Sequence, residues 1–321
     1  MTWKLAFYGT GERAQPYLRA LARRSDVHLV AACDLERRAA EQTAAGWRAR
    51  VFLSYEAMLQ ESRPDALFIC VEPHLQGDVI LKAAEMGVPF FVEPPGAVDF
   101  TRADLYSRVV AEKNLVTAVG YSARHTDVVC EGREYVGANR VPLVLGWWMQ
   151  QSAADTARNA ATVLGNDASR LLDAARFYCG EVARVRALAA TGSGIVVQLE
   201  FASGTVGVVT CAIFARPEPR VELEFLGEGW SLLFGDGLGV LRLAESDKVT
   251  IIRRQNDPAA DQAFEFLDAV AAGDPSLVRC SYPDARSTMA LCHAAALSAE
   301  SGAPVELANV SAGQATPPAT A

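Results

Sequence analysis

The first 120 residues alternate short apolar runs with longer segments in which apolar residues recur every three or four positions. The short runs predict strands and the periodic segments predict helices. Nearly continuous apolar strands separated by helices are typical of a parallel sheet that is covered on both faces through right-handed crossovers. The predicted strands cover 4–9, 27–34, 50–54, 64–71, 89–93 and 115–121, and the predicted helices cover 12–24, 36–47, 55–62, 76–87 and 101–114.

The pattern changes after residue 121, where strand-like runs follow one another with short glycine-rich or polar turns between them. This arrangement predicts an antiparallel meander, with helices packed on one face of an open sheet. We therefore expect an α/β domain over 1–120, an α+β domain over 121–307 and a loose tail over 308–321. The predicted strands cover 143–150, 183–192, 194–203, 204–215, 220–229, 230–237 and 239–246, and the predicted helices 161–179, 259–272 and 283–301.

Composition and charge narrow the classes of function. The 321 residues are 50% hydrophobic and carry a formal net charge of −8 with no basic cluster, so we expect neither nucleic acid nor an anionic membrane as a partner. The chain shows no signal-peptide pattern and no long apolar run, which predicts a cytoplasmic protein. Seven dispersed cysteines predict buried thiols, and four scattered histidines without a ligand-spacing motif predict no metal site.

A glycine-rich turn lies between the first predicted strand and helix. Gly9, Gly11 and Ala14 form the G-x-G-x-x-A pattern, and Asp34 ends the next strand, where an acidic residue binds the ribose of a dinucleotide. The first domain is therefore predicted to be a Rossmann domain that binds NAD. Two alternatives stay open: Arg37 and Arg38 could accept the 2′-phosphate of NADP, and the turn could bind nothing.

Motifs along nearly the whole chain resemble those of the glucose-fructose oxidoreductase, inositol dehydrogenase and MocA family. They run from "FYGTGERA", "CDLERRAAE" and "VEPHLQGDVILKAAEMGVPFFVEPP" to "VGYSARH", "SRLLDAARFYCG" and "SYPDARSTMALCHAAALSAESGAPVEL". The resemblance implies a Rossmann domain and a C-terminal domain whose open sheet forms homodimers or homotetramers. It also places a set of cofactor-binding residues: Gly9, Thr10, Gly11, Glu12, Arg13, Asp34, Arg38, Val71, Glu72, His74, Glu93 and Pro94.

The chain departs from the family pattern at its proton-transfer positions. The family's Glu-Lys-Pro reads Glu93-Pro94-Pro95 here, so the lysine is absent. In the family's second motif, Asn166 stands at the aspartate and Arg170 at the histidine, and a one-residue shift would bring in Asp167 without restoring a histidine. Neither an amide nor an always-protonated guanidinium runs ordinary acid–base chemistry near neutral pH. We also expect a glutamate at position 72 to repel the pyrophosphate unless its side chain turns away.

Several other residues are candidates for the substrate side. The resemblance places Tyr121 and Arg124 near the cleft between the domains, and Tyr121 is the candidate neutral acid, with a packing or hinge role as its alternative. Arg170 could bind a substrate anion or pair with an aspartate on its own helix. Trp147 and Trp148 are neighbours on a strand, so we expect one under the helices and one on the open face of the sheet.

Three functions are consistent with these observations. The first is hydride transfer between NAD(P) and a small polar substrate, with the proton supplied by Tyr121, water or the substrate; biliverdin reductases look similar and also replace the lysine. The second is a catalytically silent nucleotide-binding sensor, like the galactose repressor relatives of this family. The third is a redox-neutral enzyme that retains its cofactor.

Overall fold

The computed structural model describes residues 2–150, 160–190, 193–213 and 218–311. Their contacts divide into two compact units, the first formed by residues 1–122 and 257–286, the second by 123–256 and 287–321. Parts of the expected strands 183–192 and 204–215, and residues 312–321 of the expected tail, lie outside the described residues.

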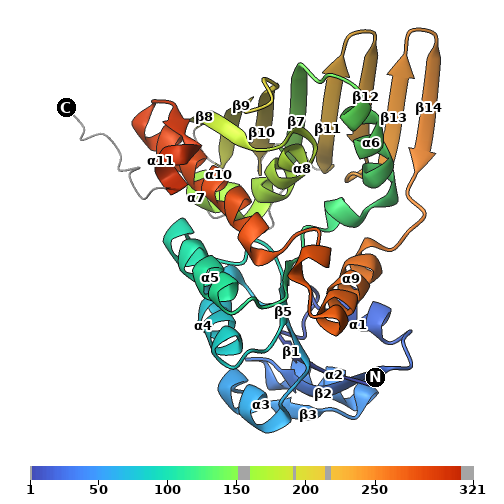
Figure 1. Ribbon diagram of the computed structural model, residues 1–321, viewed down its shortest axis with the longest axis vertical. Helices are drawn as coiled ribbons and strands as arrows, with labels where there is room; N and C mark the ends of the chain where they lie inside the picture. Colours follow the sequence, from blue (N-terminus) through green and yellow to red (C-terminus); the bar gives the residue numbers. More distant parts are fainter. Residues whose placement is uncertain (1, 151–159, 191–192, 214–217, 312–321) are drawn as a thin grey trace. The chain divides into compact units, whose positions relative to one another are not determined.

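The first unit is a six-stranded parallel sheet in the order β3-β2-β1-β4-β5-β6. This order confirms the predicted doubly wound fold, and helices cover both faces of the sheet (Figure 1). The strands are β1 (Trp3–Tyr8), β2 (Val27–Cys33), β3 (Arg50–Phe52), β4 (Ala66–Ile69), β5 (Phe90–Val92) and β6 (Thr117–Val119). The helices between them are α1 (Gln15–Leu21), α2 (Arg37–Trp47), α3 (Tyr55–Ser62), α4 (Pro73–Glu85) and α5 (Phe100–Glu112).

A helix from far along the chain completes this unit. Helix α9 (Pro258–Ala272) begins at Asp257, whose side chain accepts a hydrogen bond from the Ala260 N–H, and ends at Gly273 in the left-handed conformation. Its buried Phe266 packs edge-on against Phe68, with ring centroids 5.7 Å apart. The sequence assigned residues 257–286 to the second domain. In the structure they join the first unit, because the apolar face of α9 is buried in the core of the Rossmann sheet.

The second unit is a nine-stranded sheet in the order β14-β13-β12-β11-β7-β10-β9-β8-β15. It is largely antiparallel as predicted, but β7 and β10 pair in parallel, so the simple meander was wrong at that position. The strands are β7 (Leu143–Met149), β8 (Val182–Ala189), β9 (Gly194–Phe201), β10 (Val206–Ala212), β11 (Arg220–Gly227), β12 (Trp230–Gly235), β13 (Val240–Glu245), β14 (Lys248–Arg253) and β15 (Val305–Glu306).

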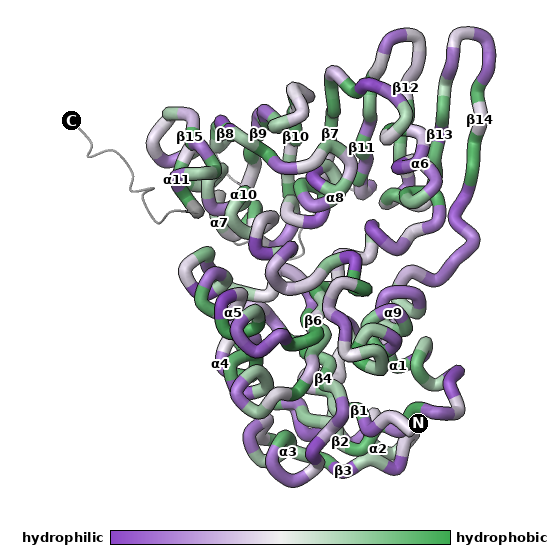
Figure 2. The backbone as a smooth tube through the Cα atoms, in the orientation of Figure 1, coloured by the Kyte–Doolittle hydropathy of each residue, from purple (hydrophilic) through white to green (hydrophobic). Residues whose placement is uncertain are grey.

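Helices pack on one face of this sheet (Figure 1). Close packing is visible at Gly146, where an added Cβ would lie 3.0 to 3.4 Å from side chains of Leu171, Val209 and Leu223. In Figure 2 several strands of both sheets carry hydrophobic stretches. The helical elements are α6 (Asp127–Ala138), α7 (Ala160–Val163), a π-helical turn (Leu164–Ala168), α8 (Ser169–Cys179), α10 (Tyr282–Ser301, whose first residues belong to the first unit), α11 (Leu307–Ser311) and short 3₁₀ turns at Ser122–His125 and Pro275–Leu277.

Candidate functional site

The glycine-rich loop follows β1 and requires glycine at its first position. Gly9 has φ of +86°, and a Cβ there would lie 2.5 Å from the carbonyl oxygen of Cys70. The Gly9 N–H donates to the Cys33 carbonyl at 2.8 Å. The loop therefore lies tightly against the carboxyl ends of both neighbouring strands, β2 and β4. The positive φ of Gly9 is a backbone conformation that residues with a side chain rarely adopt.

Asp34 holds this loop from the end of β2. Its Oδ2 accepts hydrogen bonds from the Thr10 N–H at 2.7 Å and the Thr10 hydroxyl at 3.1 Å, and its Oδ1 accepts from the Glu36 N–H at 3.0 Å. The two sequence features that predicted the nucleotide site are therefore in direct contact. Because Asp34 takes the Thr10 N–H, that group does not serve a phosphate in this conformation.

The next residues of the loop fit a dinucleotide. Within the described part of the chain, the N–H groups of Gly11, Glu12 and Arg13 make no hydrogen bond, and an added Cβ at Gly11 would meet no atom within 4 Å. Three N–H donors beside open space are what a pyrophosphate needs. The buried Ala14 lets α1 approach the sheet. A cavity of about 540 Å³ extends from this loop between α1 and α2.

Glu72, which we expect to repel a pyrophosphate unless its side chain turns away, forms an ion pair in this structure. Arg13 from the glycine-rich loop forms an ion pair with Glu72, with 3.1 Å between the guanidinium nitrogen and the carboxylate oxygen. The pair is half-exposed and joins the loops that follow β1 and β4. Of the other predicted cofactor-binding residues, Val71 is buried at the end of β4, whereas His74 and Arg38 are exposed on the first turns of α4 and α2.

Glu93, the first residue after β5, is a buried carboxylate. Its Oε1 accepts a short hydrogen bond from the Tyr17 hydroxyl, and the Gln262 side-chain amide donates to the same hydroxyl at 2.9 Å. The amide of Gln76 donates to the Glu93 carbonyl at 2.9 Å. Pro94 follows as a buried residue at the position of the missing lysine. Sequence reasoning did not identify Tyr17 or Gln262, because an aromatic and an amide on helices carry no motif.

The charge of Glu93 acts on a neighbouring thiol. Burial raises the pKa of Cys70 well above its usual value, and the negative charge of Glu93 raises that pKa further. Cys70 is therefore a protonated, inert thiol at the base of the loop.

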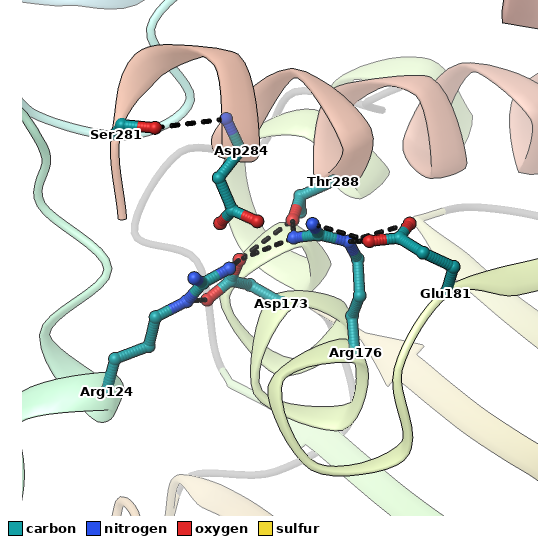
Figure 3. A network of polar contacts seen from close by, with 7 residues as sticks. All are labelled: Arg124, Asp173, Arg176, Glu181, Ser281, Asp284 and Thr288. Carbon is teal, nitrogen blue, oxygen red and sulfur yellow. Dashed lines mark hydrogen bonds and ion pairs between the residues drawn. The ribbon is translucent and has the colours of Figure 1, made fainter. Parts of the chain in front are cut away.

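The second unit contains a buried charge network around Asp173 (Figure 3). Arg124 donates to both oxygens of Asp173, at 2.8 and 2.6 Å, and the Thr288 hydroxyl donates to Oδ1 at 2.8 Å. Arg176 lies 3.9 Å from Asp173 and forms close hydrogen bonds with Glu181. Only 3% of the Arg124 side chain is exposed and its guanidinium donates to Asp173, whereas the position of Arg124 near the cleft between the domains stays a prediction.

The predicted catalytic residues lie in both units. Tyr121 belongs to the first unit and is buried, 2% exposed, where the chain turns after β6. Asn166 and Arg170 belong to the second unit, with Asn166 exposed and Arg170 half-buried. Asn166 lies in the π-helical turn that precedes α8, and Arg170 lies in the first turn of α8. Such a turn adds one residue to the helical register and is frequent at functional sites.

The tryptophan pair divides as predicted. The Nε1 atom of Trp148 is buried, and Trp148 pairs with the buried Cys211 on the helix-covered face. Trp147 points to the other face, where the guanidinium of Arg220 lies 4.4 Å from its ring centroid. Among the described residues no cluster of three or more histidine, cysteine, aspartate or glutamate side chains could hold a metal ion, and no helix could span a membrane.

The sequence of this chain was compared with protein families and with known proteins. Residues 3–121 match the model of an oxidoreductase family with an NAD-binding Rossmann fold. The levoglucosan dehydrogenase of Pseudarthrobacter phenanthrenivorans is 26% identical over 136 residues, which are 38% of this chain and 35% of that protein. The inositol 2-dehydrogenase of Rhizobium meliloti is 27% identical over 124 residues, 39% of this chain and 37% of that protein. The matched part thus spans about a third of each relative.

Solved structures extend the likeness to both units. A levoglucosan dehydrogenase in complex with NADH and levoglucosan superposes with a TM-score of 0.87 at 18% identity, covering 96% of this chain and all of the other (100%). At this identity the likeness concerns the fold. The NAD-binding Rossmann fold predicted from the sequence is confirmed, and the resemblance to the glucose-fructose oxidoreductase, inositol dehydrogenase and MocA family is supported over residues 3–121.

Proposed function

We propose that this protein binds NAD and transfers hydride between the nicotinamide and a small polar substrate. The observation that carries the proposal is the contact between the glycine-rich loop and Asp34, with three N–H donors beside open space. When bound, the nicotinamide would supply or accept the hydride, while the loop and Asp34 would hold the pyrophosphate and the adenosine ribose.

NAD is favoured over NADP by charge. The Asp34 carboxylate is fixed at the end of β2 by three hydrogen bonds, and it would repel a 2′-phosphate. Of the two arginines that could offset this repulsion, Arg37 lies 3.6 Å from Glu41 in an exposed ion pair. Arg38 is exposed on the same turn and keeps NADP open as the second choice.

A sugar- or cyclitol-like substrate is supported by the relatives, which are named for levoglucosan and inositol. The chain would act on such a substrate without the family's lysine and histidine. Arg170 and Asn166 would bind polar groups of the substrate, and the proton would come from Tyr121, from water or from the substrate. The absence of both usual proton-transfer residues also supports a second function, a nucleotide-binding sensor without turnover.

The open face of the second sheet supports a homodimer or homotetramer. Large apolar side chains are exposed on its strands, with Ile251 59%, Leu188 57% and Val249 52% accessible. These side chains lie on β14 and β8, near opposite edges of the sheet, and exposed apolar side chains are common at interfaces between subunits.

Turnover is tested by a screen of sugars, cyclitols and their oxidised forms, in which the absorbance of the nicotinamide reports the reaction. An enzyme gives a substrate-dependent change in absorbance, whereas a sensor gives ligand-dependent affinity without turnover. Arg170→Ala is expected to raise the KM of the active substrate and leave the Kd of NAD unchanged. An unchanged KM would refute the role of Arg170.

A further inference from the structure

A buried chain of three polar side chains ends at the carboxyl end of β5. Gln262, Tyr17 and Glu93 come from α9, α1 and the β5 loop, and their exposed fractions are 3%, 4% and 7%. Gln262 donates to the Tyr17 hydroxyl, and the hydroxyl donates to Glu93. Aromatic rings fix the middle member, because Tyr17 packs on Phe91 with ring centroids 4.9 Å apart.

This order of donors and acceptors favours the ionised form of Glu93, whereas burial opposes it. The oxygen of Tyr17 accepts from the Gln262 amide, so its own hydrogen is directed to the carboxylate. A phenol has an ordinary pKa near 10 and a glutamate near 4.3, so the proton stays on the phenol. A hydrogen bond donated to the charged form of a carboxyl group stabilises that form. The hydrogen bond from Tyr17 therefore favours a negative charge at a fixed position.

The strand order locates this charge relative to a dinucleotide. In doubly wound sheets the dinucleotide lies across the carboxyl ends of the strands where the order reverses, here between β1 and β4. The glycine-rich loop that would hold the pyrophosphate follows β1, and Asp34, which would bind the adenosine ribose, follows β2, so the nicotinamide half of a bound dinucleotide would lie towards β4 and β5. Glu93 is the first residue after β5. The Glu93 side chain is closely packed at this edge of the sheet, because a Cβ added at Gly120 would lie 3.1 Å from the Oε1 atom of Glu93.

The two redox forms of the cofactor differ in charge at this position. The nicotinamide ring is positively charged when oxidised and neutral when reduced, whereas the rest of the dinucleotide is the same. We propose that Glu93, held by Tyr17 and Gln262, makes the site bind oxidised nicotinamide more tightly than the reduced form. This inference rests on the proposed NAD site and assigns Glu93 a charge-based role and Tyr17 a positioning role. It makes bound NADH a stronger hydride donor and favours substrate reduction.

The test compares the Kd of NAD⁺ with the Kd of NADH by calorimetric titration. Glu93→Gln keeps the shape and removes the charge, and it is expected to lower the ratio Kd(NADH)/Kd(NAD⁺) by about tenfold, which corresponds to about 1.4 kcal/mol. Tyr17→Phe keeps the charge and removes its donor, so a smaller decrease in the ratio, about threefold, is expected. Neither measurement depends on turnover.

Two control variants separate this effect from general damage. Asp34→Asn is expected to weaken both forms together and leave the ratio unchanged, because both carry the same adenosine ribose. Glu112→Gln, on the exposed end of α5, is expected to change neither Kd. An unchanged ratio in Glu93→Gln, or in Tyr17→Phe should Glu93→Gln not fold, would overturn the inference while the NAD site stands. Absence of binding by the unmutated protein would overturn the proposed function and this inference with it.

Discussion

Substituting Asp173 by asparagine tests the buried network of the second unit. Asp173 is 0% and Arg124 3% exposed, and two hydrogen bonds of 2.6 and 2.8 Å join them. An asparagine keeps the volume but removes the negative charge that pairs with the Arg124 guanidinium and places an amide near it. Removing one partner of a buried ion pair costs about 3–5 kcal/mol, because the remaining charge stays desolvated.

The effect is large enough to be measured by calorimetry. A unit of this size shifts its midpoint by about 2–4 °C per kcal/mol, so the transition of the second unit is expected to fall by roughly 10 °C. Calorimetry is preferred because two units need not unfold in one step. The loss is expected to spread from α8 to α10, since Asp173 on α8 also accepts from Thr288 on α10.

A second ion pair in the same unit provides the control. Arg184 and Glu306 join β8 to β15, but both side chains are about half exposed, 47% and 46%. Water and salt screen such a pair, so Glu306→Gln is expected to leave the transition where it was. If Asp173→Asn shifts the transition no more than Glu306→Gln does, the account of the buried network is wrong.

Three further predictions concern other parts of the molecule. Gly9→Ala is expected to lower the thermal midpoint, measured by calorimetry, and to lower the NAD affinity at least about tenfold, measured by titration. Gly11→Ala is expected to lower the NAD affinity and leave the thermal midpoint unchanged. Ile251→Lys is expected to shift the assembly towards monomers in light scattering, and an unchanged mass would remove the open sheet as the interface. Burial raises the pKa of four thiols to about 12, against about 9 when unfolded, so unfolding releases their protons between these values and stability is expected to fall as pH rises from about 9 to 12. The four thiols are those of Cys33, Cys179, Cys211 and Cys292. Rapid reaction of any of these thiols with a thiol reagent at pH 8 in the folded protein would contradict the raised pKa values.

The fold of the first unit could be predicted because each strand and helix carries its own periodic pattern. The assignment of α9 could not, because an amphipathic helix shows that it has a buried face without showing which sheet covers it. The parallel pairing of β7 with β10 was missed for a related reason, since these strands are not consecutive and local turns do not determine their pairing. Helix α6 and strand β14 were not identified at all.

Some features of the nucleotide site could likewise be predicted from the sequence, and others could not. The glycine-rich loop and Asp34 form a motif of fixed spacing, so their contact was predictable from sequence. The pairing of Arg13 with Glu72 was not, because no local pattern links a residue of the glycine-rich loop to one that follows β4. Tyr17 and Gln262 are 245 positions apart, and only the docking of α9 on the first unit brings them to Glu93.

The most direct test of the central claim is a titration of ligand-free protein with NAD, NADH, NADP and NADPH, in the unmutated form and in Asp34→Ala. We predict that NAD binds more tightly than NADP, and that Asp34→Ala weakens the binding of NAD, because the ribose contact and the anchor of Thr10 are lost together. If none of the four dinucleotides binds to the unmutated protein, the glycine-rich loop is not a working nucleotide site and hydride transfer is excluded.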